Sequence, residues 1–540
     1  MRPECPAGPP AGQFLGGRRL AAINHRRVII AASLGTVFEW YDFFLYGALA
    51  AFFSTRFFPA ENETAALLAS LAAFGAGFGV RPLGAIVFGH LGDRIGRKKT
   101  FLMTIVLMGT ATAAVGLLPT YADIGIWASA ALVTLRLVQG LAIGGEYGGA
   151  AVYVAEHAPP GKVGFHTGWI NTTAAGGFLV SLAVVLSCRG ILGEDAFNDW
   201  GWRVPFILSL VLLVISVYIR LRMNESPVFE AMKERGTTSR NPIVESFSSW
   251  ANTRRIVVAM LGVANGTTVI WYTAQFSTFY FLQTALRIDP TTSMILVAIS
   301  ATLTLPGCAF FGWVSDRVGR KPVMMTSYAL AILLIFPAFK MITALGNPDL
   351  LNAQEQSPVT ITGPNCTFDL FAKEQAGGCP RALDFFSSRG VSYDRQSTGA
   401  DSPLIVTIGV QEIRGFDNDA YTAALLEAGY PDRADPAKIN HVAIVAIITA
   451  LMILAAAGYG PTAAILAEMF PARVRYTSLS VPYHFGTGWF GGFLPLVSQL
   501  IVAISGNIYA GLWYPVTIAT IALIVMALMI PETRGRPLDA

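Results

Sequence analysis

The chain has 540 residues and a mass of 57.8 kDa, enough for three or four soluble domains of about 150 residues each. Its composition excludes that class. Hydrophobic residues make up 53% of the chain and charged residues 13%, whereas soluble domains carry roughly 25% charge. The mean hydropathy of +0.53 also excludes a disordered chain, and 5 cysteines are too few for a disulfide scaffold. The remaining class is a polytopic membrane protein.

Apolar runs recur along the chain, and most reach the roughly 20 residues that a helix needs to cross the hydrocarbon of a bilayer. We therefore expect an all-α fold with twelve transmembrane helices. They are predicted at residues 28–53, 65–89, 101–119, 125–155, 167–187, 204–219, 256–280, 293–313, 323–339, 441–466, 478–504 and 509–530.

The distribution of basic residues predicts the orientation of these helices. Residues 1–27 lack the apolar segment of a signal peptide, so we expect the chain to start in the cytoplasm. The N-terminal tail and the loops on its side contain 24 Lys and Arg, whereas the short loops on the other side contain 4. This excess indicates that both termini are cytoplasmic, in a multi-pass protein of a plasma membrane, most simply a bacterial inner membrane. The net charge of +4 then needs no nucleic-acid partner.

One outer loop, residues 346–440, is long and polar. It contains Cys366 and Cys379, thirteen residues apart. An oxidising outer compartment favours a disulfide between them, and the alternative is a pair of free thiols.

Two segments of the chain repeat. Residues 89–99 read GHLGDRIGRKK and residues 312–321 read GWVSDRVGRK, and each follows an even-numbered predicted helix. Later acidic residues repeat at offsets that differ only by the length of the outer loop, which predicts two six-helix halves. The expected organisation is a tail at 1–27, a first lobe at 28–221, a linker at 222–255, a second lobe at 256–530 with the insert 346–440, and a tail at 531–540.

The repeated GxLxDRxGRK pattern resembles the major facilitator superfamily. Further segments resemble its metabolite–proton symporter branch, which includes transporters of proline/betaine, α-ketoglutarate and shikimate. These segments are GTVFEWYDFFLYG at 35–47, RPLG at 81–84, RLVQGLAIGGEYGGAA at 136–151, AEHAPPG at 155–161 and DWGWRVPF at 199–206. The second copy of the loop pattern departs from the first, because Ser315 stands where the first copy has Gly92.

The resemblance implies that the two copies of the loop form a cytoplasmic gate, in which acidic and basic side chains pair in one state and separate in the other. The alternative is that these basic loops only orient the helices. The expected gate residues are Asp93, Arg97, Glu146, Glu156, Asp316, Arg320 and Glu468.

Ionisable residues inside a membrane are costly and usually functional. At 1.5 Å per residue, Glu39, Asp42, Arg81 and Arg136 all lie near the midplane of the first lobe. We expect these four to form one buried cluster that carries the coupled proton, with Asp42 as the first candidate. The alternative is a permanent structural ion network.

The substrate is expected to contact polar and aromatic groups of both lobes, although ordinary helix packing also explains many such residues. The candidates are Arg136, Arg81, Gln139, Tyr41, Asn171, Asn265, Tyr272, Gln275 and His484.

The sequence therefore predicts a monomeric proton symporter that imports a small organic acid or a betaine-like zwitterion. The alternatives are a proton-independent uniporter or exchanger, and a membrane sensor that does not transport. The chain has no GxxxxGK[ST] segment, so ATP is not expected to drive it. We expect no cofactor, no metal site and no enzyme activity.

Overall fold

A computed structural model describes residues 25–58, 63–95, 97–145, 147–221, 242–369, 375–399, 402–471, 475–536 and 538. Only the backbone is described for residues 25–35, 89, 90, 92–95, 97, 98, 101, 153, 157, 219, 220, 242, 243 and 246.

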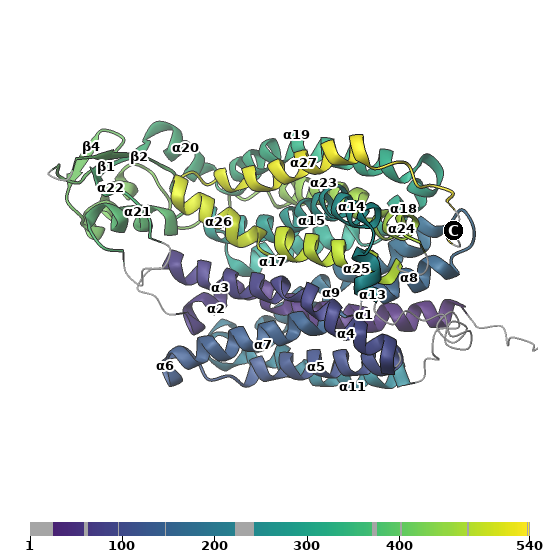
Figure 1. The fold of residues 1–540 in the computed structure, drawn as a ribbon. Coiled ribbons are helices and arrows are strands. Elements are labelled where there is room, and N and C mark those ends of the chain that lie inside the picture. Colours follow the sequence, from purple (N-terminus) through teal and green to yellow (C-terminus); the bar gives the residue numbers. More distant parts are fainter. Residues whose placement is uncertain are drawn as a thin grey trace, which may run out of the picture.

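The helices form two lobes that lie side by side (Figure 1). The first lobe contains α1 (His25–Ala48), α2 (Ala50–Phe57), α3 (Glu63–Gly79), α4 (Arg81–Ile95), α5 (Arg97–Leu117), α6 (Tyr121–Ile124), α7 (Ile126–Gly144), α8 (Tyr147–His157), α9 (Val163–Leu192), α10 (Glu194–Ala196), η1 (Phe197–Gly201) and α11 (Arg203–Leu221).

The second lobe follows the short helix α13 (Pro242–Phe247). It contains α14 (Trp250–Ala259), η2 (Met260–Ala264), α15 (Asn265–Tyr272), η3 (Thr273–Ser277), α16 (Thr278–Tyr280), η4 (Phe281–Ala285), α17 (Pro290–Thr304), α18 (Gly307–Val318), α19 (Arg320–Gly346), α23 (His441–Tyr459), α24 (Thr462–Met469), α25 (Arg475–Phe485), η5 (Gly486–Gly492), α26 (Leu494–Ser505), η6 (Ala510–Leu512) and α27 (Trp513–Met529).

Helices occupy all twelve predicted positions in the described part of the chain. Nine helical segments there are long and apolar enough to cross a membrane, or ten if the bent pair Glu194–Gly201 and Arg203–Tyr218 forms one span. The apolar helix Leu102–Leu117 is shorter. The remaining predicted position, 28–53, is covered by α1 and α2.

Two predicted spans contain π-helical turns where the lobes face each other. The first is formed by α14 to η4, in which η2, η3 and η4 are π-helical, and the second by α25, η5 and α26. Such turns widen a helix locally and often occur at functional sites.

The segment between α19 and α23 forms a small α/β unit at one end of the bundle, which was not predicted as a sheet. Its helices are α20 (Pro348–Gln356), α21 (Gly378–Ser388) and α22 (Asn418–Glu427), and its strands are β1 (Val359–Pro364), β2 (Tyr393–Thr398), β3 (Ile405–Ile408) and β4 (Gln411–Arg414). The strand order is β2-β1-β3-β4, with β1 and β2 parallel and the other pairs antiparallel.

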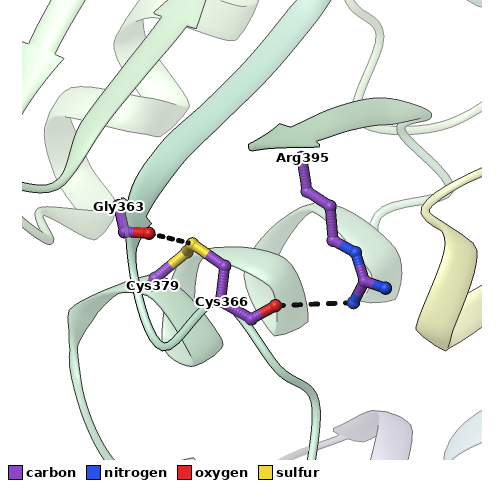
Figure 2. Close-up of a disulfide and its surroundings, with 4 residues drawn as sticks. All are labelled: Gly363, Cys366, Cys379 and Arg395. Atoms are coloured by element: carbon purple, nitrogen blue, oxygen red, sulfur yellow. Dashed lines mark hydrogen bonds between the residues drawn. A yellow bond between two sulfur atoms is a disulfide. The ribbon is translucent and has the colours of Figure 1, made fainter. Parts of the chain in front are cut away.

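A disulfide joins Cys366, just after β1, to Cys379 in the first turn of α21 (Figure 2). Arg395 of β2 donates to the carbonyl oxygen of Cys366 at 3.4 Å. The sheet is thus fastened to α21 covalently, and both cysteines are buried.

We call the end of the bundle that carries this unit the insert end. The opposite end, at which the C-terminus lies, is the terminal end (Figure 1). Between them, α9 of the first lobe packs along α18 of the second lobe. The two backbones approach closely because glycines face the partner helix. A Cβ atom on Gly168 would lie 2.6 Å from the carbonyl oxygen of Cys308.

Candidate functional site

A closed cavity lies between the two lobes. The first lobe supplies Trp40 and Phe44 from α1, Arg81 from α4 and Ala174 from α9. The second lobe lines it with Thr268, Trp271, Tyr272, Tyr459, Tyr483 and Thr487. The remaining space holds about one water molecule, so the lobes are closed around it.

Arg81 is the charged residue of this cavity. Its side chain is fully buried, and none of its three guanidinium nitrogens has a hydrogen-bond partner among the described residues. The guanidinium lies 5.2 Å from the ring centres of both Trp40 and Phe78. These rings stabilise the cation through their faces, and the Tyr483 hydroxyl lies beside it without forming a hydrogen bond of normal geometry. Arg81 is thus positioned to donate two parallel hydrogen bonds to a carboxylate.

Glu39 lines a second small cavity, together with Thr36, Trp40, Ile143, Tyr147, Ala150 and Ile170. Trp40 lines both cavities. Glu39 is buried, with 5% of its surface exposed.

Asp42 faces away from both cavities, toward α11. Ser209 of α11 lies beside it, and the neighbouring Tyr41 donates to the carbonyl oxygen of Pro205 at 2.6 Å. Asp42 is also buried, and its Oδ1 has no hydrogen-bond partner in the described part of the chain.

Arg136 lies in a separate buried site. Its Nη1 donates to Gln139 at 2.6 Å and to the carbonyl oxygen of Phe43 at 3.4 Å, and Gln139 in turn donates to Thr112 at 2.8 Å. The rings of Phe43 and Tyr46 lie 4.4 and 4.6 Å from the guanidinium carbon. Nε and Nη2 have no partner among the described residues.

The structure therefore places Asp42 and Arg136 of the expected cluster in separate surroundings, Asp42 beside Ser209 and Arg136 beside Gln139. No ion pair joins Glu39 or Asp42 to Arg81 or Arg136 among the described residues. Residues three apart on a helix differ in direction by about 60°, which is enough to face different neighbours. Equal depth in the membrane thus did not imply contact.

The predicted polar residues of the second lobe are buried and incompletely paired. Asn265 Oδ1, Gln275 Oε1 and both ring nitrogens of His484 have no hydrogen-bond partner among the described residues. Buried polar atoms are nearly always paired, so these atoms are candidates for contact with a ligand or water. Only Tyr272 of this set lines the closed cavity.

Asn171 connects the two lobes near the cavity. Its Nδ2 donates to the carbonyl oxygen of Tyr459 at 2.7 Å, and its Oδ1 accepts from Tyr147 at 3.0 Å. Tyr147 stacks on Tyr483 with ring centres 3.6 Å apart, and the hydroxyl groups of Tyr483 and Tyr459 hydrogen-bond to each other. Tyr147 lines the cavity of Glu39, and Tyr459 and Tyr483 line that of Arg81, so these contacts connect the walls of the two small cavities.

Sequence reasoning missed most of the aromatic lining. Trp40, Phe44, Trp271 and Tyr459 were not among the predicted substrate contacts, although they line the cavity. A usable signal was the position of Trp40 directly after Glu39 in the 35–47 segment. The other three are aromatic residues in apolar runs, which look like ordinary packing residues.

Three predicted gate residues form a buried ion triad at the terminal end. Arg320 lies between Asp316, at 2.6 Å, and Glu468, at 2.9 Å. The two carboxylate oxygens of Asp316 also accept from the backbone N–H groups of Gly164 and Phe165, each at 2.8 Å. These amides belong to the first turn of α9, so Asp316 of the second lobe caps a helix of the first lobe.

A second contact across the lobes joins Glu156 to Arg475 at 3.0 Å, a partner that was not predicted. The side chains of Asp93 and Arg97, and the whole of Glu146, lie outside the described residues.

Glu532 and Leu538 also make hydrogen bonds at the terminal end. Glu532 accepts backbone hydrogen bonds from Arg320, Lys321, Thr533 and Arg534 at 2.8 to 3.1 Å. Burial acts to raise the pKa of Glu532, but these four N–H donors outweigh it and lower the pKa below its usual value. Arg475 also donates to the carbonyl oxygen of Leu538 at 2.5 Å.

Within the described residues, no group of three or more His, Cys, Asp or Glu side chains is placed to hold a metal ion.

The fold and the closed site between its lobes define a class, the two-lobed secondary transporters. A family model described as "Sugar (and other) transporter" matches residues 28–244 and 422–540, and the chain belongs to this family, not to an enzyme family.

Two curated relatives cover a similar part of the chain. The chain is 37% identical over 327 residues to a proline/betaine transporter of Salmonella typhimurium, which covers 59% of this chain and 65% of that protein. It is 36% identical over 320 residues to a citrate-proton symporter of Salmonella typhi, covering 58% of this chain and 72% of the symporter. The match thus spans just under two thirds of the first relative's length.

The fold is similar to a partially occluded inward-open structure of the xylose transporter XylE from E. coli. The TM-score is 0.58 at 15% identity, over 95% of this chain and 99% of the other. At that identity the similarity shows the major facilitator fold alone.

Proposed function

We propose that the chain is a proton-coupled symporter that imports a small organic acid or a betaine-like zwitterion by alternating access. The observation that carries this proposal is Arg81, a fully buried cation whose N–H groups have no acceptor among the described residues, in a cavity closed between two lobes. A bound carboxylate supplies the missing acceptor. The surrounding aromatic rings favour a compact ligand with an apolar or quaternary ammonium part.

Proton coupling is proposed for the two buried carboxyl groups of α1. An ionised carboxylate buried inside a membrane is costly, and a proton removes that cost. Trp40 lines both the cavity of Glu39 and the cavity of Arg81, so a ligand that moves Trp40 also changes the surroundings of Glu39. Asp42 lies on the α11 side of the same helix. The relative that is named a citrate-proton symporter supports this part of the proposal.

We further propose that the insert end faces outward and the terminal end faces the cytoplasm of a bacterial cell. The excess of basic residues in the loops of the terminal end supports this orientation. The disulfide at the insert end supports it as well, because disulfides persist in oxidising compartments.

The test is uptake into proteoliposomes with an imposed pH gradient, using radiolabelled proline, betaine and citrate as probes. We expect accumulation of at least one of them against its gradient, and loss of that accumulation when the pH gradient is collapsed. Arg81→Gln should abolish binding, whereas Arg414→Gln, an exposed arginine on β4, should behave as the unmodified protein.

The alternatives give different results in the same vesicles. An exchanger or uniporter would equilibrate a probe without concentrating it, and a sensor would bind a probe without moving it. If both Asp42→Asn and Glu39→Gln still concentrate the substrate at the expense of the pH gradient, proton coupling through α1 is ruled out.

A further inference from the structure

The insert, residues 346–440, is attached to the second lobe by more than its two chain ends. The backbone N–H of Tyr393 donates to the carbonyl oxygen of Gly506 at 2.9 Å, beside the end of α26. Arg287, which follows η4, donates to the carbonyl oxygen of Ser388 at 3.0 Å. The insert therefore moves with the second lobe.

The insert also contacts the first lobe, at the start of α3. Phe368, at 9% exposure, packs in one apolar cluster with Leu68 of α3 and Ala503 of α26. Leu68 belongs to the first lobe and Ala503 to the second, so one side chain of the insert fills the seam between the lobes. In addition, α21 lies against α3.

A polar contact accompanies this cluster. The carboxyl group of Asp384 on α21 lies beside the hydroxyl of Thr64 and the carboxylate of Glu63, both in the first turn of α3. The other charged or titratable groups that face it are Arg389 and Tyr393 of the insert. Its Oδ1 has no hydrogen-bond partner among the described residues.

We propose that the insert is a strap that holds the two lobes together at the insert end, and that Phe368 and Asp384 must release α3 before this end opens. The proposal rests on alternating access, in which the ends of α3 and α26 separate when the transporter opens outward. Because the insert is fixed to the second lobe, this separation removes Phe368 from Leu68 and exposes both to water.

The polar contact makes the strap sensitive to pH. Burial raises the pKa of Asp384 to about 6, and the neighbouring Glu63 carboxylate adds to the rise, while Thr64 and Arg389 act in the opposite direction. In the released state the carboxyl group returns to water and its ordinary, lower pKa. The strapped state therefore binds the proton more tightly, so it is favoured below pH 6 and weakened as the pH rises through 6.

The experiment measures the distance between the lobes directly. Spin labels are placed at Ile124→Cys on α6 and Val442→Cys on α23, both exposed and both at the insert end, after Cys5, Cys188 and Cys308 are replaced by Ser. Distance distributions by pulsed electron resonance need neither substrate nor a proton gradient. A failure of the strap is thus distinguishable from a failure of the proposed transport function.

We expect Phe368→Asp to increase the long-distance population at least threefold over the parent. Val410→Asp is the matched control, because Val410 is fully exposed at the β3–β4 turn of the same insert and should leave the distribution unchanged. Leu68→Asp tests the same contact from α3 without touching the fold of the insert. If Phe368→Asp and Leu68→Asp both leave the parent distribution unchanged, the strap is refuted.

The pH dependence is tested with Asp384→Asn, which mimics the protonated carboxyl group. The parent should have a larger long-distance population at pH 7.5 than at pH 5.5, and Asp384→Asn should have the small population at both values. An equal pH response in the parent and in Asp384→Asn would show that the titrating group lies elsewhere and would overturn the role of Asp384.

Discussion

Arg81 and Arg136 are both fully buried cations of the first lobe, yet their surroundings give them different roles. Arg136 already donates to Gln139 and to a backbone carbonyl oxygen, so part of its hydrogen-bonding capacity is used within the lobe. Arg81 donates to no described residue and lies in the cavity between the lobes. A charge buried without acceptors is costly, and a ligand that supplies them gains the corresponding free energy.

The first prediction compares these two arginines. Arg81→Lys keeps the charge but loses the planar pair of N–H donors, so we expect carboxylate binding to weaken by about 10- to 100-fold, or about 1.4–2.8 kcal/mol. Arg136→Lys should instead lower the midpoint of thermal unfolding and leave affinity within about threefold. Ligand affinity by calorimetry and unfolding in detergent measure the two effects. The reverse pattern would assign the ligand to Arg136.

The second prediction concerns Glu532, whose pKa is lowered by its backbone donors. A group with a lowered folded-state pKa stabilises the fold above its unfolded-state pKa, and this contribution is lost as the pH falls through the folded-state value. Glu532→Gln should therefore lower the unfolding temperature at pH 7, and the difference from the parent should shrink as the pH falls toward 3.5. Glu412→Gln, on exposed β4, is the control. A constant difference across this range would contradict the assignment.

Sequence reasoning reached some of these residues and not others, for a physical reason. A charge inside an apolar run is visible in the sequence, so Glu39, Asp42, Arg81 and Arg136 were all found, and all four are buried. Which of them face each other depends on the rotation of each helix about its axis, which apolar runs of this kind do not fix. Aromatic lining residues such as Trp271 have no distinguishing signal, because the same side chains also fill ordinary cores.

At the scale of elements, the close contact of α9 with α18 depends on glycine residues, which have no side chain. A Cβ atom on Gly168 would lie 2.6 Å from the carbonyl oxygen of Cys308 and 2.9 Å from Cα of Ala309, both closer than any ordinary contact. Both neighbours are backbone atoms, which cannot rotate away. The two lobes can therefore close along this seam only while position 168 is glycine.

The third prediction follows from that seam. Gly168→Ala should force α9 and α18 apart and slow transport at least tenfold, with the terminal end held open. Gly190→Ala on the same helix is a matched control, since no neighbouring atom lies within 4 Å of its Cβ position. It should transport normally and unfold at an equal or slightly higher temperature. Equal transport rates for the two variants would show that the seam does not need to close.

The positions of the helices were predictable because twenty apolar residues in a row have few alternatives to a membrane span. The insert was harder. Its disulfide was anticipated as one of two alternatives, but its four strands have only four to six residues each, and β2 does not alternate, since five of its six residues are exposed. The partners of the gate were also only partly visible, because Arg475, the partner of Glu156, lies outside both copies of the repeated loop pattern.

At the scale of the whole molecule, the lobes are joined at both ends of the cavity. At the insert end, Tyr280 of the second lobe donates to the carbonyl oxygen of Gly47 in the first lobe at 2.8 Å. At the terminal end, Asp316 caps α9 of the first lobe. The conformation is therefore closed on both sides, and opening in either direction breaks a different set of contacts.

The fourth prediction uses this separation. Asp316→Asn keeps the shape of the side chain but removes the charge that stabilises the positive end of α9 and pairs with Arg320, so the terminal end should open more often. Tyr280→Phe removes one hydrogen bond, about 1 kcal/mol, from the insert end only.

Accessibility is measured at Thr268→Cys, a cavity residue, in a background with Cys5, Cys188 and Cys308 replaced by Ser. A membrane-impermeant thiol reagent is applied to right-side-out and to inside-out vesicles. Asp316→Asn should speed labelling in inside-out vesicles, and Tyr280→Phe should speed it in right-side-out vesicles by up to about fivefold. If both substitutions change labelling from the same side, the two ends do not open separately and the closed state is not an intermediate between two access states.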